Sequence, residues 1–122
     1  MNGKYFKASE LACPCCGTLA MPQWFIDKLD ALREQCGFPL TITSGYRCPK
    51  YNSRFGGKAP HESGLAVDIG INGARAHTVI REALVLEFNG IGVAQKGDRA
   101  GRFIHLDCLP AGKYPRPAVW SY

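Results

Sequence analysis

The sequence has no apolar run near the ~20 residues that a transmembrane helix needs. Its best candidate is the four-residue run 83–86, which lies between Glu82 and Glu87. The first seven residues contain two lysines with no apolar stretch after them, so we expect no secretory signal. No run of five or more basic residues occurs. These absences predict a soluble protein that neither enters a membrane nor binds nucleic acid through a basic tail.

What is present suffices for one compact core. Of the 122 residues, 46% are hydrophobic and 20% are charged, which is typical of a globular domain and excludes a wholly disordered chain. Because neither an internal repeat nor a linker divides the sequence, we expect one domain over residues 1–122, acting as a monomer. The formal charge of +5 is compatible with an anionic partner or with plain solubility.

Apolar periodicity predicts two main helices. The first lies between Pro22 and Gly37, two residues suited to the start and the end of a helix. Its apolar stripe consists of Phe25, Leu29, Leu32 and Cys36. The second helix is predicted over residues 75–88. Its inward face is expected to carry Ala76, Val79, Ile80, Ala83 and Leu84.

Runs rich in β-branched and apolar residues predict short strands over residues 40–44, 65–69, 91–93 and 103–107. A short helix is predicted over residues 49–55, with a loop over residues 56–60. Because a polar turn at residues 95–101 joins the last two strands, we expect those strands to pair in antiparallel fashion. The sequence therefore predicts an α+β fold with a small, partly antiparallel sheet packed with two main helices.

Three histidines limit the metal chemistry that is open to this chain. His105 and Asp107 are two residues apart in a predicted strand, so their side chains share one face. Asp68 follows His61 by seven residues. Two imidazoles and one carboxylate are a zinc ligand set that leaves a fourth position for water. On spacing alone, ordinary polar surface groups are the alternative, and His77 is interpreted as such a residue on the second helix.

Three motifs follow one another along the chain. They are Ser44-Gly45-Tyr46-Arg47-Cys48, then His61-x-x-Gly64-x-Ala66-x-Asp68, then Phe103-Ile104-His105-Leu106-Asp107. In this order and spacing they resemble the zinc D-Ala-D-Ala carboxypeptidase family, and residues 6–16 and 116–122 resemble its short single-domain branch. The resemblance implies a fold like that of hedgehog and the D-Ala-D-Ala peptidases. It also implies a zinc metallopeptidase that hydrolyses peptidoglycan stem peptides by metal-activated water, as a carboxypeptidase or an endopeptidase.

The resemblance makes His61, Asp68 and His105 the zinc ligands. Arg47 matches a family arginine that contacts the carboxylate or the polarised carbonyl oxygen of the substrate. A guanidinium suits this role because its fork gives a carboxylate two charge-assisted hydrogen bonds. A surface salt bridge is the alternative role for Arg47.

The general base departs from the family pattern. Several members place Glu or Asp three residues before the last zinc histidine, where this chain has Arg102, which accepts no proton. We predict Asp107 as the base, and the alternative is that Asp107 orients a ligand histidine. Asp98 and Glu62 are further candidates. The departure also leaves open a different function, that of a non-catalytic zinc-containing module which binds the cell wall or belongs to a virion.

Six cysteines are unusual in a chain for which no export signal is expected. The densest group consists of Cys13, Cys15 and Cys16. This group could form a structural zinc site with Cys36 or another thiolate. Because the implied substrate lies outside the cytoplasm, we favour disulfides instead, with unpaired buried thiols as the alternative. If Arg47 and His105 converge on one site, Cys48 and Cys108 are candidates for one pair. We expect the protein to be made in the cytoplasm and to act on the cell wall, in the periplasm or outside the cell, with phage delivery as one route.

Overall fold

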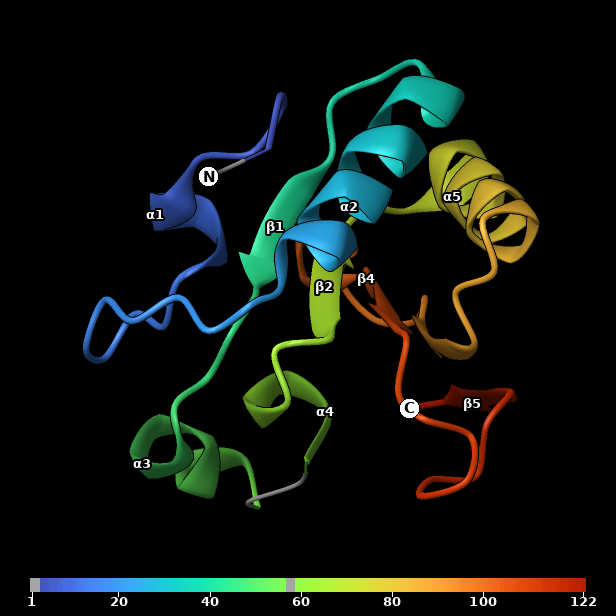
Figure 1. Ribbon diagram of the computed structural model, residues 1–122. Coiled ribbons are helices and arrows are strands. Elements are labelled where there is room, and N and C mark those ends of the chain that lie inside the picture. The colour runs from blue at the N-terminus through green and yellow to red at the C-terminus, as the bar shows by residue number, and fades with distance from the viewer. Residues whose placement is uncertain (1–2, 57–58) are drawn as a thin grey trace.

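The computed structural model describes residues 3–56 and 59–122 (Figure 1). These residues form five α-helices, two short 3-10 helices and five strands. In chain order the elements are α1 (Ala8–Leu11), α2 (Gln23–Cys36), β1 (Thr41–Ser44), α3 (Pro49–Asn52), η1 (Ser53–Phe55), α4 (Ala59–Glu62), β2 (Ala66–Gly70), α5 (Gly73–Val85), β3 (Gly90–Ala94), η2 (Arg99–Gly101), β4 (Phe103–Asp107) and β5 (Ala118–Ser121). The predicted α+β class is confirmed.

The strands form one mixed sheet in the order β1-β2-β4-β3-β5. Three neighbouring pairs are antiparallel, namely β1 with β2, β2 with β4, and β4 with β3. Only β3 and β5 run parallel within this sheet. The antiparallel pairing predicted for the strands near residues 91–93 and 103–107 is therefore confirmed.

One face of the sheet forms the hydrophobic core with the two long helices. Alternation along β4 sends Ile104 and Leu106 into this core, where both are fully buried. Helices α2 and α5 pack against each other, and Figure 1 shows them side by side. Their buried residues are Phe25, Ile26, Leu29, Leu32, Ala76, Val79 and Ala83. Burying each large apolar side chain stabilises the fold by roughly 1.5–3 kcal/mol. The opposite face of the sheet is thereby free to carry polar groups.

The second helix differs from its prediction at its C-terminal end. Leu84 is 60% exposed because it lies about 100° around the helix from buried Ala83. The helix ends at Val85, and Glu87 then adopts a left-handed conformation with φ of 65°. This turn brings Phe88 back into the core, where it is 2% exposed.

Helix α4 and strand β5 were not predicted. Helix α4 begins at Ala59, so the loop predicted over residues 56–60 is wrong at its end, while residues 57–58 of that loop lie outside the described part. Strand β5 was missed because it is short and its residues are half-buried or exposed. None of the helices that the described residues form has the length and apolar character needed to cross a membrane.

Candidate metal centre

The polar face of the sheet brings two of the predicted ligands together. Asp68 on β2 pairs directly with His105 on β4, so both side chains stand on the face opposite Val67 and Leu106. Helix α4 supplies His61 above this pair. All three side chains are buried, with exposed fractions of 8% or less. The register of two central strands thus positions two of the three side chains.

The three side chains converge on one carboxylate oxygen. Asp68 Oδ1 lies 3.0 Å from His105 Nδ1 and 3.3 Å from His61 Nε2. The three donor atoms all lie within 4.8 Å of one another. Ligands bound tetrahedrally at zinc–nitrogen distances of about 2.0–2.1 Å are separated by roughly 3.3 Å. The donor set therefore fits Zn²⁺ in both chemistry and spacing.

Hydrogen bonds fix which nitrogen of each imidazole faces this point. His61 Nδ1 lies 2.9 Å from the carbonyl oxygen of Gly45. Because a carbonyl only accepts, Nδ1 carries a hydrogen, and Nε2 is the nitrogen that faces Asp68 and is placed to bind a metal. His105 has the opposite orientation, with Nε2 2.7 Å from Asp107 Oδ2 and Nδ1 facing Asp68.

Asp107 lies behind His105 and is fully buried. Arg116 holds its carboxylate with two hydrogen bonds, Nε to Oδ1 and Nη2 to Oδ2, each 2.8 Å long. Room for this carboxylate exists because Gly90, its partner on β3, has no Cβ. A methyl group at that position would overlap the Asp107 side chain. The carboxylate predicted as the base is thus engaged by an arginine and by a ligand histidine.

The pKa values of Asp68, His105 and Asp107 are shifted so that each group favours its charged form. Burial alone would raise the pKa of Asp68, but hydrogen bonds from His105 and His61 hold it well below its usual range. Burial alone would lower the pKa of His105, but Asp107 and Asp68 raise it. Burial would also raise the pKa of Asp107, which Arg116 and His105 lower to about 2. Without a metal, the two carboxylates thus favour the charged form of His105.

Arg47 enters the site from the segment after β1. Its Nε donates to Ser44 Oγ at 2.9 Å, and its guanidinium carbon lies 4.0 Å from the centre of the Phe55 ring. Nη2 lies 3.7 Å from Asp68 Oδ2, and the side chain is 14% exposed. The guanidinium is thus held beside the donor set at the wall of a cavity.

That cavity has a volume of about 710 Å³ and opens over His61, Asp68 and His105. Its other lining side chains include Phe55, Phe103, Tyr114, Arg116, Trp120 and Tyr122. All ten acidic residues lie in the described part of the chain, and of these only Asp68 lines the cavity.

The other candidates for the base, Asp98 and Glu62, lie outside that lining. Arg102, which occupies the position of the base in several family members, also lies outside it. Its guanidinium donates to the carbonyl oxygen of Gly97, at 3.1 Å from Nε and 2.9 Å from Nη2. Asp98 precedes η2 and is exposed. Glu62 accepts a hydrogen bond of 3.3 Å from Asn52, which does line the cavity. His77 is exposed on α5 and does not line the cavity, as expected for an ordinary polar residue of the helix surface.

Arg116 and Trp120 are site residues for which the sequence predicted no role. The Trp120 ring lies 5.2 Å from that of His105, and Arg116 stacks over Trp120 at 5.1 Å. Both come from the C-terminal segment, which reaches the site only because β5 pairs with β3. The sequence contains Arg116 and Trp120, but no motif or periodic spacing linked them to Asp107, so their role could not be predicted.

The cysteines differ from the predicted pairing. All six lie in the described residues and all are free thiols, so the favoured disulfides are not formed. Cys108 lies near Lys28 and the backbone of Asn89, and Cys36 lies near Glu82. Cys48 instead lies beside the N-terminal loop that carries Cys13. Cys108 is therefore not in place to pair with Cys48, and the thiol that joins Cys13 and Cys15 is that of Cys48 rather than that of Cys36.

The Cys13 and Cys48 thiols influence each other. Burial alone would raise the pKa of the Cys13 thiol. Backbone N–H groups of Cys48, Cys15 and Cys16 lower it instead, to about 7. The Tyr51 N–H lowers the pKa of Cys48, but burial and the neighbouring thiols raise it to about 11. The Cys13 thiol is thus the more acidic of the two.

The donor set and the open cavity beside it are those of a metal-dependent hydrolase. Comparison with protein families gives a match over residues 4–107 to the family described as Peptidase M15. The chain therefore belongs to the peptidase M15 family of zinc metallopeptidases, which contains the zinc D-Ala-D-Ala carboxypeptidases, and the predicted family and enzyme class are confirmed. Comparisons with curated proteins and with solved structures gave no significant match. Arg116 and Trp120 lie beyond the matched residues.

Proposed function

We propose that this metallopeptidase hydrolyses peptide bonds in the stem peptides of bacterial peptidoglycan. The observation that carries the proposal is the Arg47 guanidinium, fixed at the cavity wall 3.7 Å from Asp68. The other arginine of the described lining, Arg116, is occupied by Asp107. Arg47 is thus the guanidinium placed to receive an anionic group of the substrate, such as the terminal carboxylate of a stem peptide.

His61, Asp68 and His105 would hold the zinc ion in this proposal. When bound, zinc would act as a Lewis acid toward the scissile carbonyl and make water more acidic. Arg47 would bind a carboxylate or the developing oxyanion, because its fork can donate two hydrogen bonds. Ser44 and Phe55 restrict the guanidinium, so little side-chain entropy is lost when substrate binds.

For Asp107 we propose the orienting role rather than that of the base. Its carboxylate receives two hydrogen bonds from Arg116 and faces His105 Nε2, so it fixes the histidine with Nδ1 toward Asp68. A base needs an oxygen that faces the cavity, and Asp107 does not line it. Arg116 then acts through Asp107 as a second positioning residue.

The proposed substrate is tested with purified peptidoglycan and with a short synthetic stem peptide that ends in D-Ala-D-Ala. We expect the zinc-loaded protein to release D-Ala or shortened muropeptides, detected by mass spectrometry. A chelator should stop the release and added zinc should restore it. The same peptide with an amidated C-terminus separates the two reaction types, because only a carboxypeptidase that binds the terminal carboxylate should discriminate against it.

Two results would overturn the proposal. If the zinc-loaded protein leaves both peptidoglycan and the free-acid peptide intact, peptidoglycan peptides are not its substrate. If it binds peptidoglycan without hydrolysing any bond, the non-catalytic wall-binding module is the better description.

A further inference from the structure

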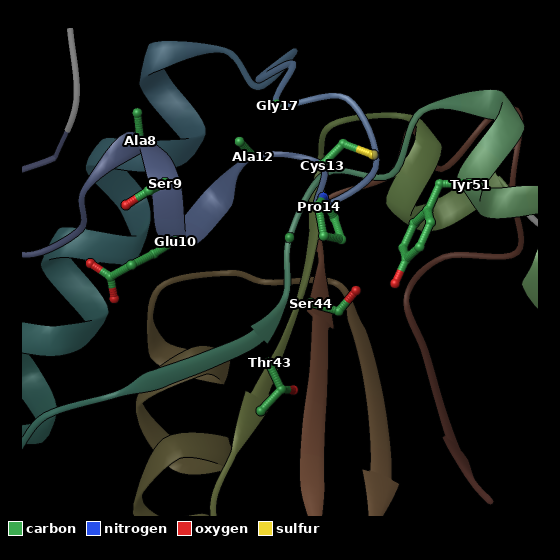
Figure 2. Close-up of a pocket in the computed structure, with 11 residues that line it drawn as sticks. Ala8, Ser9, Glu10, Ala12, Cys13, Pro14, Gly17, Thr43, Ser44 and Tyr51 are labelled. Atoms are coloured by element: carbon green, nitrogen blue, oxygen red, sulfur yellow. The ribbon is translucent and has the colours of Figure 1, made fainter.

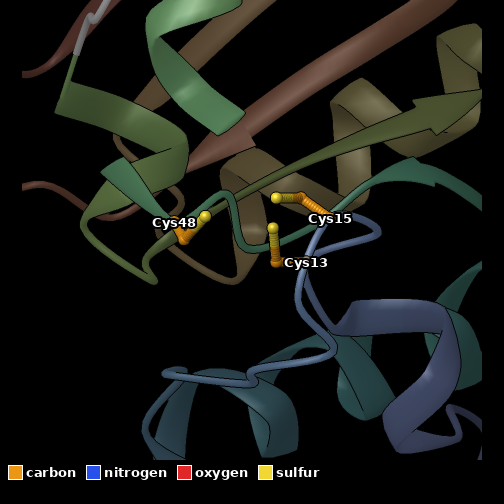
Figure 3. A group of neighbouring side chains, drawn as sticks. All are labelled: Cys13, Cys15 and Cys48. Carbon is orange, nitrogen blue, oxygen red and sulfur yellow. The ribbon is translucent and has the colours of Figure 1, made fainter. Parts of the chain in front are cut away.

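A second group of metal-binding side chains lies apart from the histidine site in the fold. Cys13 and Cys15 belong to the loop between α1 and α2, and Cys48 immediately precedes α3. Figure 3 shows their three sulfur atoms turned toward one another. These sulfur atoms all lie within 4.8 Å of one another. No disulfide joins them, since all three are free thiols.

Backbone contacts bring the two segments together. The Tyr46 N–H donates to the carbonyl oxygen of Leu11 at 2.8 Å. Gly45 permits this approach, because a Cβ there would lie 2.5 Å from the same Leu11 oxygen. Residues 45 and 46 are therefore docked against the end of α1, directly before the loop that carries the first cysteines. The close approach of Cys48 to Cys13 follows from this docking rather than from any sulfur–sulfur bond.

The N-terminal loop itself has a shape suited to holding thiolates. Cys13 N–H donates to the Thr18 carbonyl, and Gly17 N–H donates back to the Cys13 carbonyl, each at 2.8 Å. Gly17 closes this turn with a positive φ of 75°. The backbone N–H groups of Cys15 and Cys16 lower the pKa of the Cys13 thiol. Such an environment stabilises the charged sulfur that a metal requires.

Cys16 supplies a fourth sulfur. It lies exposed on the same turn, follows Cys13 at the C-x2-C spacing of zinc-binding turns, and helps raise the pKa of the Cys48 thiol. The set therefore contains three thiols from one tight turn and one from a distant segment. Four thiolates in a tetrahedron are a ligand set of structural zinc sites, in which no position remains open for substrate.

We propose that Cys13, Cys15, Cys16 and Cys48 bind a structural Zn²⁺ ion. Thiolates this close repel one another, and a divalent cation removes that repulsion while each sulfur loses its proton. A cleft of about 430 Å³ borders the cluster, and Figure 2 shows Cys13 and Pro14 facing Ser44 and Tyr51 across it. This cleft gives the ion a route to the buried Cys13.

The proposed ion would connect the N-terminal loop with the segment that positions Arg47. Cys48 is the next residue along the chain, and its sulfur accepts the Tyr51 N–H at 3.4 Å at the start of α3. A metal at Cys48 thus restrains the backbone on one side of Arg47. This zinc site does not depend on the proposed substrate, because its ligands lie outside the histidine site.

The test is the metal content of the full chain, purified with a thiol-free reductant, dialysed against a small excess of zinc and measured by elemental analysis. We expect two zinc ions per wild-type chain. The Cys48→Ser and Cys15→Ser variants should each retain one, and His61→Ala should also retain one. The matched controls Cys36→Ser and Cys108→Ser remove thiols outside the cluster and should keep two.

Cobalt provides a second readout that survives loss of the histidine site. In the His61→Ala chain, added Co²⁺ should give the intense near-ultraviolet absorption of thiolate-to-cobalt charge transfer, and Cys48→Ser on that background should remove most of it. The proposal is overturned if the reduced wild-type chain holds one zinc ion that His61→Ala removes. It is also overturned if the cobalt-loaded His61→Ala chain shows no thiolate band, or if mass analysis of the non-reduced protein finds Cys48 in a disulfide that persists with zinc present.

Discussion

The two groups of metal-binding side chains in this molecule are built in opposite ways. The histidine site stands on paired strands, is almost fully buried and borders a large open cavity. The cysteine cluster lies on loops, and two of its four members, Cys15 and Cys16, are exposed. A site that must accept substrate needs rigid support and an open position, whereas a set of four thiolates supplies its own closed shell.

The hydrogen bonds that support the two groups also differ. At the histidine site, Gly45 and Asp107 each fix one imidazole, and Arg116 fixes Asp107. At the cysteine cluster, a backbone N–H group, that of Tyr51, donates directly to the Cys48 sulfur. Removal of a side chain should therefore affect the two regions separately.

The largest expected effect is that of His61→Ala. Loss of this ligand should reduce peptidase activity to background, because the remaining pair of donors is below the three that catalytic zinc sites use. The exposed His77→Ala is the matched control and should behave as wild type in both activity and metal content. Hydrolytic activity that persists in His61→Ala would show that the catalytic metal lies elsewhere.

Arg47→Lys should reduce kcat/KM by about 100-fold, the effect of losing one transition-state donor. Lysine keeps the charge but loses the fork and the stacking on Phe55. Arg54→Lys is the matched control, because this exposed arginine also lies over an aromatic ring, that of Tyr51, but does not line the cavity. Equal activities for the two variants would exclude Arg47 from substrate binding.

Asp107→Asn separates the two roles that the sequence left open for this residue. If Asp107 orients His105, zinc affinity should fall by about 10- to 100-fold, measured by competition with a coloured chelator. If Asp107 were the base, zinc affinity would be unchanged while kcat collapsed at saturating zinc. Arg116→Gln should resemble Asp107→Asn in weakening zinc, since it acts through the same carboxylate.

The sequence predicted contacts between residues close together in the chain better than contacts between distant segments. Strand β4 was predicted with its observed bounds, because Ile104 and Leu106 alternate with His105 and Asp107. The shared face of His105 and Asp107 followed from the same local alternation. Their hydrogen bond is a contact between residues two positions apart, and a period of two is enough to find it.

Longer-range contacts needed the fold. The pairing of Asp68 with His105 depends on strand register, and its place in the site came from family resemblance rather than from periodicity. Arg116 reaches Asp107 only after the chain turns back to form β5. Cys48 approaches Cys13 because Tyr46 is docked on Leu11, a contact that no local pattern signals.

Gly90→Ala should destabilise the protein by about 1–3 kcal/mol, the usual cost of overpacking a closed site. The added methyl group would meet the Asp107 carboxylate, so its effect should appear at the histidine site and not at the cysteine cluster. Gly112→Ala is the control, because no atom lies within contact distance of a Cβ there. Urea unfolding of the zinc-loaded proteins measures both, and equal stabilities would contradict the packing described here.

The smallest expected effect is on pH dependence. The pKa of His105 is raised above its ordinary value, so in the metal-free protein its charged form contributes stability below about pH 6.5. That contribution is lost as pH rises through the raised pKa, whereas zinc binding requires the neutral form. Zinc affinity should therefore rise by about tenfold per pH unit below this pKa and then level off. Affinity that is constant between about pH 5 and 8 would contradict the charge assignment.

The most direct measurement is a crystal structure of the zinc-loaded protein with anomalous data collected at the zinc absorption edge. We expect a peak bound by His61 Nε2, Asp68 and His105 Nδ1 at about 2.0–2.2 Å, with Asp107 on the far side of His105. A second peak is expected among the four cysteines. No peak at the histidine site, or an ion bound to His105 Nε2 in direct contact with Asp107, would contradict this description of the catalytic centre.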